Sequence, residues 1–226
     1  MLATELFDAY RSETGDNRRP YFWSGSDIWR YMNDAYSMFV RLTGGIGDTS
    51  SDITQVDITA GERQSTVSTK ILKFREARLN SNGVSLKIIN YTDFPLRTDV
   101  DYGTTSLLAS NNLPGEVKYM VIGEQRGFVS WARVPEVDDS VSLSVYRLPI
   151  CALSDSEYEI VDVDEEHHNH LLLWMKALGY DKHDADTFNP DKRDACKQAF
   201  MDYCTFVKAE LERARSKVRL VAYGGY

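Results

Sequence analysis

Residues 24–45, SGSDIWRYMNDAYSMFVRLTGG, predict the helical part of this fold. Ser24 is followed three residues later by Asp27, which matches a capping box at a helix start. Gly44 and Gly45 follow the stretch, as residues that adopt a left-handed helix cap should. Apolar side chains recur between these ends at steps of three or four residues: Ile28, Met32, Ala35 and Phe39, with Trp29, Tyr36 and Val40 beside them. This spacing predicts one amphipathic helix with one buried face.

Both ends of the chain carry further helical patterns. The stretch TELFDAYRSET (4–14) has three apolar residues at helical spacing, and GDNRRPY then breaks the pattern. After residue 161 a stripe of Leu171, Trp174 or Met175, and Leu178 returns, with Gly179 expected to close that helix. A last helix of about 28 residues is expected to begin at Asn189 as N-cap and Pro190 in the first turn.

The period changes from 3.6 to 2 in the middle of the chain. Alternating apolar residues occur in three stretches: Val56 and Ile58; Val84, Leu86 and Ile88; Val141, Leu143 and Val145. Asn82-Gly83 predicts a hairpin with a type I′ turn, because both central residues of that turn need positive φ. We expect an antiparallel sheet of roughly six to eight strands, as a sandwich or partial barrel.

These patterns predict an α+β fold with a discontinuous helical bundle and an inserted antiparallel β-sandwich or partial barrel. The expected bundle comprises residues 1–50 and 161–217, because neither end can bury its apolar stripes alone. The inserted β domain would span 51–160, and residues 218–226 would form a C-terminal tail that does not continue the last helix.

Composition narrows the function. The 226 residues carry a net charge of -8, which disfavours generic binding to phosphate backbones. The three cysteines, Cys151, Cys196 and Cys204, form neither a disulfide framework nor a CxxC pair, so a reducing compartment is expected. We expect a soluble protein made in a cytoplasm, because the sequence shows neither a secretory signal nor a stretch able to span a bilayer.

The densest cluster of chemically active side chains is DEEHHNH, residues 164–170. It lacks the HExxH spacing of zinc proteases, and Glu165-x-x-His168 has no second copy of the kind that di-iron bundles need. Acids at a helix start also complement the helix dipole, which explains them without a metal. We therefore predict no catalytic, cofactor-binding or metal site and no enzyme activity. A metal-dependent hydrolase using this cluster is the alternative.

Three other short motifs have plain explanations. GGIGD (44–48) follows a helix and lacks the lysine of a phosphate-binding loop. GEQRG (123–127) is expected to present Glu124 and Arg126 on a hairpin loop, as solvated charges or as an ion pair between subunits. RRPYFWS (18–24) mixes basic and aromatic residues as a nucleic-acid platform does, but in an acidic protein an interface or core anchor is favoured.

Four stretches resemble tailed-bacteriophage head-to-tail adaptor proteins, relatives of the tail tubular protein of short-tailed phages: residues 16–44, 60–79, 127–149 and 164–214. In the first, Trp23-Ser24 leads into Tyr31-Met32-Asn33-Asp34, similar to the family's entry helix. In the second, Ala60-Gly61 and Gln64 are similar to its turn between strands. The third resembles its aromatic strand and Asp-Asp turn, and the fourth its final helix pair.

The resemblance implies a structural virion protein that forms a dodecameric ring in the neck, between the capsid portal and the tail. It implies assembly in the host bacterial cytoplasm, binding to the portal and to a downstream stopper, nozzle or tail protein, and dsDNA passage through the lumen without specific binding or membrane contact. The portal-binding residues would lie in the C-terminal segment: Val218, Arg219, Leu220, Val221, Tyr223 and Tyr226. The long helix and the β loops are the expected ring interfaces. Another neck component, such as a stopper or tail-completion protein, is the alternative.

Overall fold

The computed structural model describes residues 1–93, 114–154, 160, 162–183 and 187–215. Two compact units divide the chain, one of Met1–Gly44 with Pro149–Tyr226 and one of Gly45–Leu148. We call them the helical unit and the β unit. Helices from both chain ends with a sheet inserted between them confirm the predicted α+β fold class.

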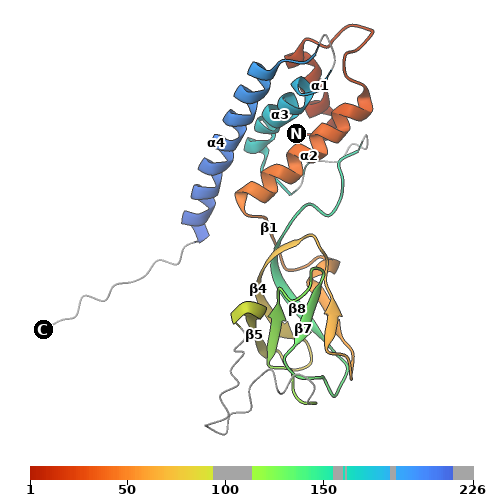
Figure 1. Cartoon of the computed structure of the whole chain (residues 1–226), viewed down its shortest axis with the longest axis vertical. Coiled ribbons are helices and arrows are strands. Elements are labelled where there is room, and N and C mark those ends of the chain that lie inside the picture. The colour runs from red at the N-terminus through yellow and green to blue at the C-terminus, as the bar shows by residue number, and fades with distance from the viewer. Residues whose placement is uncertain (94–113, 155–159, 161, 184–186, 216–226) are drawn as a thin grey trace, which may run out of the picture. The chain divides into compact units, whose positions relative to one another are not determined.

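The described residues of the helical unit form four helices: α1 (Ala3–Thr14), α2 (Gly25–Thr43), α3 (Glu165–Tyr180) and α4 (Pro190–Arg215). Helix α3 packs against each of the other three, and α2 also contacts α1 and α4 (Figure 1). Helices from the N-terminal and C-terminal parts of the chain therefore share one core, as the amphipathic stripes predicted.

The predicted helix ends are confirmed at three positions. The Oγ of Ser24 accepts a hydrogen bond from the Asp27 N–H at 3.1 Å, which caps α2. Gly44 follows α2 with a φ of 97°, a left-handed cap. The Oδ1 of Asn189 accepts from the Lys192 N–H at 3.0 Å and caps α4.

The prediction for Gly179 was wrong. Helix α3 passes through this glycine to Tyr180, and Asp181 follows in a right-handed conformation. A Cβ built on Gly179 would lie 2.0 Å from the Tyr10 hydroxyl oxygen. This glycine is therefore explained by close helix packing and not by a left-handed cap.

In the part of the β unit that the structure describes, one curled sheet has eight strands: β1 (Ile46–Asp48), β2 (Gln55–Ile58), β3 (Gln64–Thr66), β4 (Ile71–Leu79), β5 (Ser85–Asn90), β6 (Tyr119–Ile122), β7 (Phe128–Trp131) and β8 (Asp139–Arg147). The strand order is β1-β8-β4-β5-β6-β7-β3, and β2 also pairs with β8. The Ser65 Oγ of β3 donates to the Asp57 carbonyl of β2 at 2.6 Å, so the two ends of the sheet approach each other. The result is a half-barrel, one of the two predicted forms. The described residues of this unit also form two short 3-10 helices, η1 (Asp52–Thr54) and η2 (Tyr91–Asp93).

The sheet is mixed and not wholly antiparallel as predicted. Strands β5 and β6 are parallel, with Ile88 opposite Met120, while every other described pair of strands is antiparallel. A parallel pair needs a long crossover, and residues 91–118 between these strands supply the length. A hydrophobic period of 2 is the same for both directions, so the sequence pattern did not distinguish them.

The hairpin predicted at Asn82-Gly83 joins β4 to β5, but its turn is not type I′. Gly83 has a φ of 69°, and none of the described non-glycine residues, Asn82 included, has a positive φ. The Leu79 carbonyl accepts from the Gly83 N–H at 2.9 Å, and the Leu79 N–H donates to the Val84 carbonyl. The loop is therefore four residues long, with only its last residue left-handed.

Candidate docking surfaces of the helical unit

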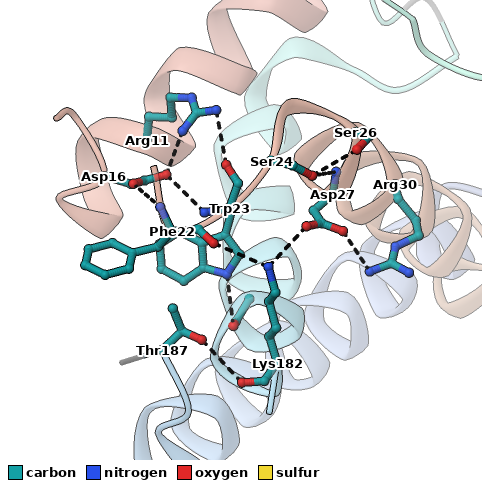
Figure 2. Close-up of polar contacts among 11 residues, drawn as sticks. Arg11, Asp16, Phe22, Trp23, Ser24, Ser26, Asp27, Arg30, Lys182 and Thr187 are labelled. Carbon is teal, nitrogen blue, oxygen red and sulfur yellow. Dashed lines mark hydrogen bonds and ion pairs between the residues drawn. The ribbon is translucent and has the colours of Figure 1, made fainter. Parts of the chain in front are cut away.

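The segment RRPYFWS (18–24), predicted as an interface or core anchor, is held in place by a buried carboxylate. Asp16, 1% exposed, accepts hydrogen bonds from the Arg11 guanidinium at 2.6 Å and from the Phe22 N–H at 2.8 Å (Figure 2). The same guanidinium donates to the Trp23 carbonyl at 3.3 Å. A charged pair of this kind satisfies donors that would otherwise be buried unpaired, so it fixes the path of the chain from α1 into α2.

Trp23 connects this segment to the C-terminal end of α3. The indole is 3% exposed, and its Nε1 donates to the Gly179 carbonyl at 3.1 Å. Its ring meets the Tyr10 and Tyr180 rings edge-on, with centroids 5.6 and 6.4 Å apart. Lys182 adds a second link, because its Nζ lies 3.3 Å from both the Phe22 carbonyl and an Asp27 carboxylate oxygen (Figure 2). Trp23 is thus the core anchor that the sequence favoured.

The residues beside Trp23 face solvent. Tyr21 is 43% and Phe22 50% exposed, and the Arg11 guanidinium lies 3.9 Å from the centroid of the Tyr21 ring. Phe188, between α3 and α4, is 41% exposed and stacks on His183. Exposed aromatic side chains are typical of surfaces that contact other proteins.

Helix α4 has a second exposed surface. Phe200, Cys204 and Val207 are buried against the other helices, while the opposite side of α4 is open to solvent. Phe206 lies on that open side and is 58% exposed. A large exposed aromatic side chain on a mostly polar helix face marks α4 as a candidate contact surface between proteins.

The histidines of the 164–170 cluster serve helix packing. The Nδ1 of His167 lies 2.9 Å from the Tyr203 hydroxyl, and the Nε2 of His168 lies 2.8 Å from the Val163 carbonyl. The ring of His170 stacks on Tyr203 with centroids 3.5 Å apart, and burial lowers the pKa of His170 below its ordinary value. These contacts join α3 to α4 and to the segment before α3.

The acids of this cluster stand at the start of α3. Asp164 occupies the N-cap position, though it makes no capping bond with its side chain, and Glu165 accepts from the N-terminal amine at 3.3 Å. Within the described ranges, no group of three or more histidine, cysteine, aspartate or glutamate residues is placed to hold a metal ion.

The buried stripe of α3 contains Leu171 and Met175, whereas Trp174 and Leu178 are only partly buried. Trp174 and Met175 were predicted as alternatives for one position in this stripe, and Met175 is the buried one.

The other predicted positions divide between the two units. Glu124 of GEQRG accepts from the Ser130 hydroxyl at 2.6 Å and lies 3.6 Å from Arg63, so it is bound within the β unit, while Arg126 is exposed. The predicted portal-binding residues lie outside the described residues: Val218, Arg219, Leu220, Val221, Tyr223 and Tyr226. Over the part of the chain that is described, none of the helices combines the length and apolar character that a membrane crossing requires.

Sequence reasoning missed two features of these surfaces. Asp16 was not predicted to be a buried residue. It lies four residues before Pro20, in the connection between two predicted helices, where buried N–H groups need hydrogen-bond acceptors. Phe206 was not singled out either. Phe206 lies next to the predicted apolar stripe of α4 but outside it, and this position indicates an exposed aromatic side chain.

The helical unit is built from both ends of the chain, it exposes aromatic side chains of the kind that contact other proteins, and its histidine cluster takes part in helix packing. A family model described as SU10 adaptor protein matches residues 1–220, and the chain belongs to that family of phage adaptor proteins. The match confirms the resemblance seen in the sequence. No curated protein matches the chain significantly.

Proposed function

We propose that this chain is a head-to-tail adaptor in the virion neck, where a ring of copies binds the portal and connects the capsid to the tail. The family match over residues 1–220 carries the proposal, because it covers both helical segments and the inserted sheet together. A structural family also favours a role without catalysis. Assembly would take place in the host cytoplasm, with twelve copies in the ring as the resemblance implies.

The exposed surfaces of the chain support ring assembly, and its net charge supports DNA passage. A ring interface is heterologous, so each subunit must offer two different surfaces to its neighbours. The open side of α4, with Phe206, and the loops of the β unit are the surfaces we assign to it. The net charge of -8 suits a lumen through which DNA passes during ejection, because an acidic wall does not hold phosphates.

We assign portal binding to residues 218–226 and the downstream stopper, nozzle or tail contact to the remaining surfaces. The test mixes the full-length chain with the portal protein of the same phage and images the complex by electron microscopy. We expect a ring of twelve copies stacked on the portal. A portal preparation that never acquires this density would contradict the adaptor assignment.

Deleting Leu220–Tyr226 tests the tail separately. The truncated chain should keep its circular dichroism spectrum and its melting temperature but fail to bind the portal. A matched variant, Phe206→Ser, should still bind portal as a single chain while forming fewer rings. Unchanged portal binding by the truncated chain would remove the assignment to residues 218–226 and leave the adaptor assignment standing.

A further inference from the structure

A pocket of about 290 Å³ opens in the β unit between three loops. The β4–β5 turn, residues 115–117 and the Pro135–Asp139 turn before β8 form its walls. Ile58, Leu79 and Val117, each no more than 8% exposed, provide an apolar floor. Such a floor favours an occupant with an apolar portion.

Carboxylates dominate the rim. Glu116, Glu136, Asp138 and Asp139 all line the pocket, and its lining contains neither lysine nor arginine. Among the described residues, two bases contact the pocket lining: Lys118 is 3.1 Å from Glu116, and Arg133 packs over Gly115. Against these two described bases stand four acids, so the described rim favours a cation.

Hydrogen bonds from the protein orient two of these carboxylates. Asp138 accepts from the Ala60 N–H at 2.7 Å, and Asp139 accepts from the Ser81 hydroxyl at 2.6 Å. Among the described residues, Glu136 makes no hydrogen bond or ion pair. Its neighbour Val137 is 73% exposed, the most exposed large apolar side chain in the described part of the chain. The rim thus presents one free carboxylate next to one exposed apolar side chain.

This geometry selects the kind of cation. No described group of three or more acids, cysteines or histidines is placed to hold a metal ion, so the rim carboxylates do not converge on one point. A cation that is wide enough to contact several carboxylates and that has an apolar stem would match both the acidic rim and the apolar floor of the pocket. An arginine side chain has that form, because its guanidinium carries five donors and its stem is aliphatic.

We propose that this pocket receives an arginine side chain from a partner protein, an interaction beyond the adaptor role proposed above. The stem would pack between Val137 and the floor residues Leu79 and Val117, and the guanidinium would reach Glu136 and Asp138. Arginine is also among the residues enriched at protein interfaces.

The test titrates blocked tripeptides into the full-length chain and follows the methyl signals of Leu79, Val117 and Val137 by NMR. Gly-Arg-Gly is the probe, and the same peptide with norleucine or glutamate at the centre serves as control. We expect saturable shifts of these methyl groups with the arginine peptide, and at least fivefold weaker binding of both controls.

Two variants check the rim. Glu136→Gln should weaken arginine binding about two- to fivefold, the range of an exposed charge pair. Asp52→Asn removes one exposed charge from the same unit away from the pocket and should leave binding unchanged. Absence of saturation, equal binding of the norleucine peptide, or full affinity in Glu136→Gln would each overturn the proposal. The comparison of peptides on the unaltered chain decides it even if a variant fails to fold.

Discussion

The hydroxyl oxygen of Tyr10 occupies the space that a Cβ on Gly179 would need, 2.0 Å from that position. Tyr10 in α1 is fully buried, and the carbonyl of Gly179 in α3 accepts the indole N–H of Trp23 at 3.1 Å. Gly179 therefore allows α1 to pack closely against α3, and its carbonyl also binds Trp23, directly before the start of α2. The packing of both chain ends depends on this contact.

Gly179→Ala should destabilise the helical unit. Alanine gains about 1 kcal/mol over glycine in a helix, but forcing a methyl group against a buried ring costs about 1–3 kcal/mol. We expect the clash to dominate, because Tyr10 is packed between Trp23 and Tyr31 and has little room to move. Urea unfolding followed by circular dichroism measures the net loss.

Two variants separate the clash from helix propensity. Tyr10→Phe removes the oxygen that clashes, so it should recover part of the stability lost in Gly179→Ala. Gly25→Ala places a Cβ 3.8 Å from its nearest neighbour, an ordinary contact, and should be neutral or slightly stabilising. Equal losses in Gly179→Ala and Gly25→Ala would show that packing against Tyr10 is not the cause.

The Arg11–Asp16 pair predicts a second stability effect. The Asp16 side chain is fully buried and that of Arg11 is 12% exposed, so the guanidinium has little water to replace its partner. Removing one member of a buried pair costs about 3–5 kcal/mol, because the other charge stays buried and unpaired. Asp16→Asn should therefore lower the free energy of unfolding by several kcal/mol, as measured in urea.

Asp8→Asn is the matched control for this prediction, because Asp8 is an exposed carboxylate on the same helix as Arg11. It should change stability by less than about 0.5 kcal/mol, as surface substitutions usually do. If Asp16→Asn behaved like Asp8→Asn, the buried network would not hold the 16–24 segment in place.

The helices could be predicted because each depends on local signals. Ser24, Gly44 and Asn189 act on backbone groups within four residues of themselves, and the apolar stripe of α2 follows from the helical period alone. Gly179 could not be assigned in this way. Its role depends on Tyr10, far away in sequence, and a glycine near a helix end resembles a cap from sequence alone.

The sheet and the candidate surfaces show the same limit. The alternation of apolar residues identifies β5 as a strand, but this pattern is the same for parallel and antiparallel partners. The parallel pairing of β5 with β6 could therefore not be read from it. RRPYFWS marked a surface segment, but only tertiary contacts decide that Trp23 turns inward while Tyr21 and Phe22 stay exposed. The pocket of the β unit joins three loops distant in sequence and had no local signal.

Asp48 predicts a pH dependence for the β unit. Burial opposes ionisation of Asp48, but hydrogen bonds from the Ser51 hydroxyl, the Ser50 N–H and the Arg147 guanidinium outweigh it and hold the pKa of Asp48 well below its usual range. The unfolded chain has a pKa near 3.9 for this group. Ionised Asp48 thus adds stability above about pH 4, and this stability is lost as pH falls toward the lower folded pKa.

Asp48→Asn should therefore be less stable than the natural chain at pH 7, with the difference shrinking below about pH 4. Thermal unfolding across pH 3–8 measures both curves. Asp52→Asn, an exposed change in the adjacent 3-10 helix, should run parallel to the natural chain at all pH values. A constant gap for Asp48→Asn down to pH 3 would contradict the proposed role of its ionisation.

Cysteine reactivity tests the packing of α4. Cys204 is 1% exposed, and burial raises the pKa of its thiol to about 12, whereas Cys151 is exposed. The thiolate is the reactive form, so a disulfide reagent at pH 8 should modify Cys151 quickly and Cys204 only when the helical unit opens. Cys196 is partly exposed, so the test uses a Cys196→Ser background. In that background Cys151→Ser should remove the fast phase, and Cys204→Ser should leave it intact. Loss of the fast phase in Cys204→Ser would mean that α4 does not cover this residue in solution. Because α4 packs on α3 and α2 and Cys204 is among its buried residues, such a result would also contradict the shared helical core.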